Sequence, residues 1–183
     1  MTQRPIRRKN RDAIASRETV IIKPPRLGTY WQGQGGIYVG VMPGENGLPD
    51  YHLIAADERG EIDRINWADQ ADHQPGALSL IDGLANTIAL RASPIRCQAA
   101  LWTAGIDIDG HKDFYLPAKN EAMICCINPE QLFEKKYRYW TSTQNARSAD
   151  YAWMQLLNYG LQSIDHKSTE YRARAVRRIL ISE

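Results

Sequence analysis

A late stretch of the chain, residues 137–181, constrains the fold most because strand-like segments follow one another there. Aromatic and β-branched residues, which favour strands, recur in three segments: 137–143, 151–157 and 171–181. The polar run 144–150 separates the first two. Asn158-Tyr-Gly160 predicts the next turn, because glycine adopts positive φ angles without steric cost. Three strands in a row predict an antiparallel meander.

The third of these segments alternates as a half-exposed strand does. Arg172 and Arg174 fall on one face. Ala173 and Ala175 fall on the other, as a period of two requires. The alternation then slips at Val176-Arg177. We interpret the slip as a β-bulge, or as the point where the strand becomes buried on both faces.

Four sequence blocks carry a resemblance to a known family, and they occur in the order Gly110-His-Lys-Asp-Phe-Tyr-Leu-Pro117, Tyr139-Trp-Thr-Ser-Thr143, Asp150-Tyr-Ala-Trp153 and Arg172-Ala-Arg-Ala-Val-Arg-Arg178. This series resembles that of the Lcl C-terminal domain family, a bacterial and prophage family of largely unknown function. The resemblance covers about residues 100–181. Phe114 stands where the family usually has Trp, and Thr141 where it has Ser. The family is similar to C-type lectin-like folds, so the resemblance implies that architecture.

The charge distribution predicts two parts, a basic arm over residues 1–26 and a globular domain over 27–183. The first 26 residues hold eight basic and two acidic side chains, whereas the whole chain has a net charge of only +2. The first 19 residues contain few apolar side chains, and Lys23-Pro-Pro25 favours an extended polyproline segment. We expect the arm to dock on a neighbouring protein. Nucleic acid ranks second, because the arm has no aromatic residue for base stacking. The candidate partner-binding residues are Arg4, Arg7, Arg8, Lys9 and Arg11.

The length of 183 residues allows one α+β domain of ordinary size. No apolar run is long enough to cross a membrane, and no apolar region follows the basic start, so neither a membrane span nor a secretory signal is expected. The glycine cluster at 33–36 favours a hairpin turn, and residues 56–76 are polar and are expected to be irregular. We expect strands over 37–42 and 51–56, and two to three helices over 78–92, 95–103 and from 116 onward.

The run from Asp107 to Asp113 suggests calcium, because acidic residues alternate in it, but its glycine and its twelfth residue do not fit the calcium-loop pattern. Asp107, Asp109 and Asp113 are therefore expected to be capping residues, with calcium left open, and no metal or other cofactor is assigned. Asn128-Pro-Glu130 resembles the calcium-binding tripeptide of sugar-binding C-type lectins but follows a predicted helix, which favours a turn.

Catalysis has little support in the sequence. The four histidines are scattered, and none lies beside a serine or cysteine in a recognisable nucleophile motif. Formylglycine-generating enzymes share the broader fold and use a pair of cysteines. Here Cys125 and Cys126 fall on a predicted helix, and with Cys97 they are expected to be buried thiols. We therefore expect no enzymatic activity.

We expect a non-enzymatic phage or prophage virion protein of the tail or capsid surface, made in the bacterial cytoplasm and homo-oligomeric, whose C-type lectin-like domain binds the host surface or a glycan. The alternatives are a bacterial glycan-binding adhesin module and, third, an enzyme of the formylglycine-generating type. Trp140 and Trp153 are assigned to the core. Recognition is assigned to the loops 144–150 and 158–168, whose polar and aromatic side chains can bind a sugar: Asn145, Arg147, Tyr159, Gln162, Asp165 and His166.

Overall fold

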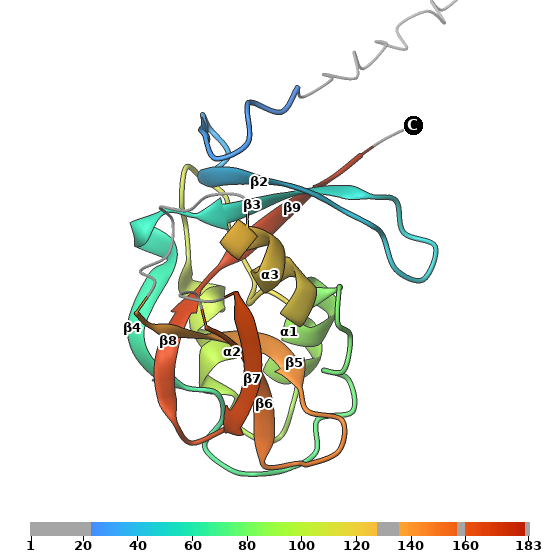
Figure 1. Cartoon of the computed structure of the whole chain (residues 1–183), viewed down its shortest axis with the longest axis vertical. Helices are drawn as coiled ribbons and strands as arrows, with labels where there is room; N and C mark the ends of the chain where they lie inside the picture. The colour runs from blue at the N-terminus through green and yellow to red at the C-terminus, as the bar shows by residue number, and fades with distance from the viewer. Residues whose placement is uncertain (1–22, 128–135, 157–159, 182–183) are drawn as a thin grey trace, which may run out of the picture.

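The computed structural model describes residues 23–127, 136–156 and 160–181, and it has an α+β fold with two curled, mainly antiparallel sheets and three α-helices (Figure 1). The predicted α+β class is therefore confirmed. The predicted partner-binding residues Arg4 to Arg11, the predicted ligand-binding residue Tyr159 and the segment 128–130 lie outside the described residues. No helix within the described ranges is both long and apolar enough to cross a membrane.

The smaller sheet has the strand order β1-β2-β3-β9 and joins the start of the domain to its end. Gly33 and Gly35 have positive φ angles in the β1–β2 turn, as the hairpin interpretation requires. The β2–β3 turn extends beyond the body (Figure 1). The expected strands over 37–42 and 51–56 are confirmed as β2 and β3. The strands of this sheet are β1 Tyr30–Trp31, β2 Gly36–Met42, β3 Tyr51–Ala56 and β9 Val176–Leu180.

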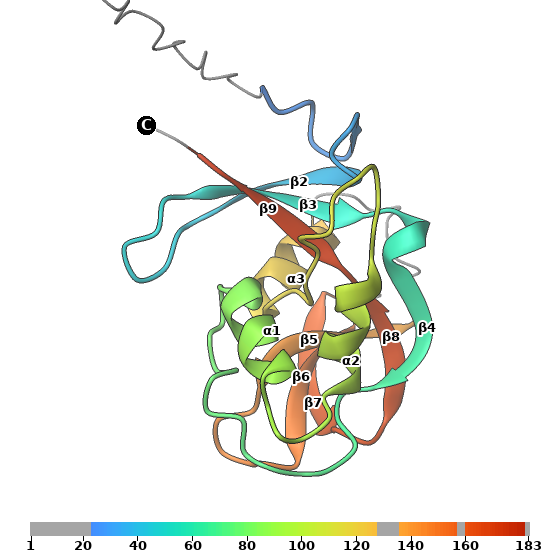
Figure 2. The ribbon, with the colours of Figure 1, turned by 180° about the vertical axis from the view of Figure 1, so that it is seen from behind.

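The larger sheet has the order β4-β8-β5-β6-β7, with β5 and β8 parallel and the other pairs antiparallel. Figure 2 shows it from behind, below the smaller sheet. The expected meander exists, but its third strand is β7, which lies within the segment expected to be a loop. The strands are β4 Glu61–Asn66, β5 Arg138–Gln144, β6 Tyr151–Leu156, β7 Leu161–His166 and β8 Glu170–Arg174.

Two other expectations about strands were wrong. The segment 56–76 contains β4, whose Glu61 pairs with Arg172 and Arg174 of β8. The single strand expected over 171–181 is two strands in different sheets, β8 and β9, separated at Ala175. The N–H of Ala175 donates to Gly60 O, and its C=O accepts from Ala56 N (both 2.9 Å). The slip in the alternation therefore marks the crossing from one sheet to the other.

The three helices pack between the sheets and beside β5 (Figures 1 and 2). They are α1 Gly83–Arg91, α2 Gln98–Trp102 and α3 Lys119–Ile127, with single 3-10 turns at η1 Glu58–Gly60 and η2 Thr103–Gly105. Asp82 caps α1 by accepting the N–H of Ala85. On α3, Ile127 is 66% exposed, whereas Ile124 packs against the core and the buried side chains include Glu121 and Cys125.

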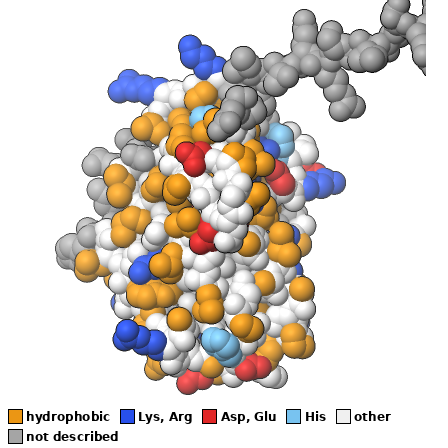
Figure 3. Space-filling view, turned by 90° about the vertical axis from the view of Figure 1, so that its right-hand side faces the viewer, with side chains coloured by type: hydrophobic (Ala, Val, Ile, Leu, Met, Phe, Trp, Pro, Cys, Tyr) orange, Lys and Arg blue, Asp and Glu red, His pale blue; other side chains and the backbone are white. Residues whose placement is uncertain are grey.

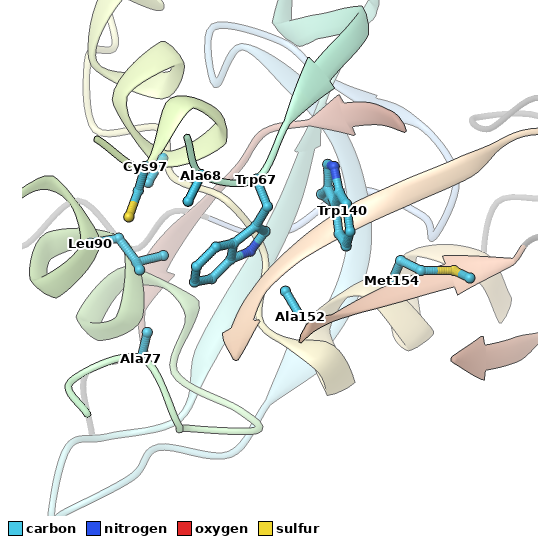
Figure 4. Close-up of a cluster of buried hydrophobic side chains, with 9 residues drawn as sticks. Trp67, Ala68, Ala77, Leu90, Cys97, Trp140, Ala152 and Met154 are labelled. Carbon is cyan, nitrogen blue, oxygen red and sulfur yellow. The ribbon is translucent and has the colours of Figure 1, made fainter. Parts of the chain in front are cut away.

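The main core cluster surrounds two fully buried indoles, Trp67 and Trp140 (Figure 4). In this view the Trp67 ring lies between Leu90 of α1 and Ala152 of β6. Both ring N–H groups have backbone acceptors, since Trp67 donates to Thr141 O (2.8 Å) and Trp140 to Ile65 O (3.1 Å). The core assignment of Trp140 is thus confirmed.

Candidate functional site

The two predicted recognition residues of the 144–150 loop, Asn145 and Arg147, differ in their exposure to solvent. Asn145 is 91% buried, and its Oδ1 accepts the N–H groups of Arg147 (2.8 Å) and Ser148 (3.0 Å), so this side chain closes the turn. Arg147 is exposed at the turn. Of this pair, only Arg147 has its polar group open to solvent, and Asn145 is structural.

The predicted residues of the 158–168 loop lie on β7 where the structure describes them. The β6–β7 register places Tyr151 opposite His166, Trp153 opposite Ile164, and Gln155 opposite Gln162. Residues directly opposite each other, and residues two apart, share a face of a sheet. Gln162 and His166 therefore lie on one face together with Tyr151, Trp153 and Ile164.

Asp165 lies on the opposite face of β7, and its carboxylate already accepts hydrogen bonds within the protein. Its carboxylate accepts hydrogen bonds from the hydroxyl of Tyr171 and from the N–H of His166. Burial works to raise the pKa of Asp165, but these hydrogen bonds outweigh it and hold the pKa below its usual value. Asp165 is therefore separated from Gln162 and His166, contrary to the grouping expected from sequence.

We define the β6–β7 platform as the shared face of these two strands with the adjoining start of α3, and its residues are Lys119, Tyr151, Trp153, Gln162, Ile164 and His166. Tyr151 is 36% and Ile164 37% exposed, and His166 is exposed too. Trp153 is only half-buried, so its assignment to the core was wrong. The platform thus offers partly exposed rings and apolar surface side by side.

Contacts within the platform fix the orientation of its rings. The Lys119 ammonium lies 3.6 Å from the centroid of the Trp153 ring, a cation–π contact. Tyr151 and His166 meet edge to face, with centroids 5.9 Å apart. Gln162 Nε2 donates to Lys119 O (2.6 Å) and to Gln155 Oε1 (2.9 Å), which ties β7 to the start of α3.

The platform combines the two kinds of group that a polyhydroxylated ligand requires. Aromatic faces stack on the apolar face of a sugar ring, and phenol, imidazole and ammonium groups exchange hydrogen bonds with hydroxyls. Tyr151 and Trp153 are two residues apart on β6, about 7 Å along a strand. Sequence reasoning found Gln162 and His166 but missed these rings. The signal was Tyr151-Ala-Trp153 itself, which becomes a surface feature once β7 is known to be a strand.

The acidic loop that suggested calcium makes internal ion pairs. Asp109 accepts from Tyr30 (2.7 Å) and Arg59 (3.2 Å), Asp107 lies 3.5 Å from Lys112, and Asp113 binds Arg177 at 2.9 and 3.0 Å. Within the ranges that the structure describes, no group of three or more His, Cys, Asp or Glu residues could hold a metal ion.

Cys125 and Cys126 lie on α3, as predicted, and Cys97 directly precedes α2. Cys97 and Cys125 are buried as expected, whereas Cys126 is only partly buried. Burial raises the pKa of Cys126 to about 12 and that of Cys97 to about 11. Cys125 is fully buried, and its pKa is raised as well. These groups are protonated at neutral pH, which does not favour thiolate chemistry.

Two buried ionisable residues near the platform were missed by sequence reasoning. Lys167 directly follows β7, and its ammonium donates to Asp72 O (2.6 Å) and Gln144 Oε1 (2.7 Å) and lies 4.7 Å from the Trp67 ring centroid. Burial lowers its pKa to about 8. Glu121, on α3, has no exposed surface. Single polar residues of this kind carry no sequence signal, because their partners are distant in the chain.

Comparison with known proteins adds no relative. No protein-family model matches the chain, and no curated protein matches it.

Proposed function

We propose that this chain is a non-enzymatic, virion-associated protein of a phage or prophage whose C-type lectin-like domain binds a glycan of the host surface through the β6–β7 platform. The basic arm docks the protein, as a homo-oligomer, on neighbouring virion proteins of the tail or capsid. The observation that carries the glycan assignment is the exposed Tyr151 and His166 pair beside Trp153 on one sheet face. Rings of this kind dominate recognition surfaces because they contribute contact area at small entropic cost.

The arrangement of the four sequence blocks supports the family resemblance. Tyr115 of the first block forms a bridge with Val176 of the fourth, with N–H to O distances of 2.8 and 2.9 Å. Pro117 O accepts the N–H of Ser142 from the second block (2.7 Å). The second block lies on β5, which pairs with the β6 strand of the third. Blocks far apart in sequence therefore form one connected unit, as a shared fold would require.

Removing the ring pair tests the glycan assignment. We expect Tyr151→Ala with His166→Ala to weaken binding to a glycan array or to host cells by at least about tenfold, because losing an aromatic anchor commonly costs more than about 1 kcal/mol. The melting temperature should change little, since both side chains are exposed. Ile88→Ala, on α1, is the matched control because Ile88 is 57% exposed away from the platform.

Binding by the double variant equal to that of wild type would remove the platform from recognition. Loss of binding in the Ile88→Ala control as well would show a non-specific surface effect. A platform that binds glycans in a protein encoded away from tail and capsid genes would favour the adhesin module over the virion protein.

Deleting residues 1–24 tests the role of the arm. The shortened protein is expected to keep its cooperative unfolding transition and melting temperature and to lose co-assembly with its neighbours, measured by calorimetry and by co-sedimentation. A variant with Arg4, Arg7, Arg8, Lys9 and Arg11 changed to Gln keeps the length and removes the charge. Loss of cooperative unfolding after the deletion would instead make the arm part of the fold.

A further inference from the structure

Glu121, the third residue of α3, is enclosed by polar groups from β3 and from the segment before the helix. Its Oε1 lies 2.7 Å from the hydroxyls of both Tyr51 and Tyr115, and its Oε2 accepts the N–H of Ala118 (2.7 Å). Gly83 makes room for the carboxyl group, because a Cβ there would lie 2.2 Å from Oε2. The side chain therefore fastens the start of α3 to β3 and to the segment before the helix.

The number of protons in this cluster can be counted. Tyr51 Oη also lies 2.8 Å from the carbonyl oxygen of Ile81, which can only accept. Three short O···O contacts then join Ile81, Tyr51, Glu121 and Tyr115, and each needs one proton. The two hydroxyls supply two. If Tyr51 donates to Ile81 and Tyr115 donates to Glu121, the third proton comes from the carboxyl group, which donates to Tyr51.

The surrounding charges do not compensate an ionised Glu121. Asp82 at the start of α1 repels it, and Arg178 of β9 is bound to Asp82 (3.0 Å) and lies against the Tyr51 ring. Cys125, one turn later on α3, is a buried neutral thiol. Burial raises the pKa of Glu121 from 4.5 to about 7, against the hydrogen bonds from Ala118 and the tyrosines, which favour the carboxylate.

We propose that Glu121 is held as a neutral acid in the folded protein and acts as a proton-dependent positioning residue for Lys119 on the β6–β7 platform. Lys119 begins α3, and its N–H donates to Thr143 Oγ1 (3.0 Å) while its side chain covers Trp153. Loss of the Glu121 proton leaves a buried charge two residues away, which loosens this first turn. Control of ligand binding by pH rests on the proposed function. The protonation of Glu121 and the movement of Lys119 do not depend on it.

The direction of the pH effect follows from the pKa. A carboxyl group whose pKa is higher in the folded than in the unfolded protein stabilises the fold fully below pH 4.5, and this contribution is lost as the pH rises through about 7. The melting temperature of wild type relative to Glu121→Gln should therefore fall between pH 5 and pH 8. Glu58→Gln, at an exposed residue, is the control and should show no such change.

Nuclear magnetic resonance of the full chain tests the two steps separately. The side-chain carboxyl carbon of Glu121, assigned by its loss in Glu121→Gln, is expected to titrate near pH 7, and titration at or below the usual value would overturn the proposal. The side-chain protons of Lys119 are shielded by the Trp153 ring, and this shielding should decrease over the same pH range in wild type but not in Glu121→Gln. A pH-independent shielding would overturn the link to the platform. Neither measurement uses a glycan. Failure of the glycan assignment can therefore be distinguished from failure of the proposal for Glu121.

Discussion

Replacing Trp140 by alanine is expected to lower the free energy of unfolding by about 3–5 kcal/mol, the usual cost of truncating a buried tryptophan. Trp140 has no exposed surface and lies in the cluster around Trp67. Its ring centroid is 4.9 Å from that of Tyr171, and its N–H donates to Ile65 O. The substitution leaves a cavity in this cluster and removes the hydrogen bond that the Trp140 ring N–H donates to the Ile65 carbonyl. Urea denaturation followed by circular dichroism measures the loss.

Trp153→Ala is the matched comparison, because the same side chain is removed from β6 where it is only half-buried. We expect less than about half the loss found for Trp140→Ala, since the indole already contacts solvent and its main partner is the Lys119 ammonium. Equal losses at the two positions would place Trp153 in the core and weaken the case for the platform. An unchanged stability of Trp140→Ala would contradict the described core.

Several strands could be predicted because their side chains carry a local pattern. Segments 37–42, 51–56 and 137–143 are rich in aromatic or β-branched residues, and the structure has strands at all three. In β4 the β-branched residues Ile62 and Ile65 stand among four polar residues, so the segment does not resemble a strand in sequence. Its Glu61 pairs with Arg172 and Arg174, which are far away in the chain. Pairing of this kind is set by tertiary structure, over more than a hundred residues of sequence, so local propensity could not reveal it.

The site was predicted in part for a related reason. Gln162 and His166 are predicted as polar groups able to bind a ligand, but the polar composition of their segment predicts a loop. In a loop, neighbouring side chains have no fixed face. Once β7 pairs with β6, the period of two separates Asp165 from His166 and adds Tyr151 and Trp153 to the surface. The missing information was the strand pairing, not the chemistry of the residues.

The buried ammonium of Lys167 makes Gln144 the second position where a single change should have a large effect. Gln144 Oε1 accepts from Lys167 Nζ and from the N–H of Gln74 (both 2.7 Å), and Gln144 is itself 99% buried. Gln144→Leu removes the oxygen that accepts these two hydrogen bonds. Of the two hydrogen bonds that the Lys167 ammonium donates, the one to the Asp72 carbonyl remains. We expect a loss of about 3–5 kcal/mol, because a buried charge without its partner retains its full desolvation cost.

A double-mutant cycle separates this charge effect from simple loss of packing. Lys167→Met alone should cost less than Gln144→Leu, because Gln144 Oε1 keeps the Gln74 N–H, and the two changes together should recover more than half of the Gln144→Leu loss. Additive losses would show that Lys167 is not the group left uncompensated.

The pH dependence of stability gives a second check on the buried ammonium of Lys167. Since burial lowers the pKa of Lys167 from 10.5 to about 8, its contribution is present above pH 10.5 and is lost as the pH falls through about 8. The stability of wild type relative to Lys167→Met should therefore increase between pH 8 and pH 10, opposite in sign to the effect of Glu121.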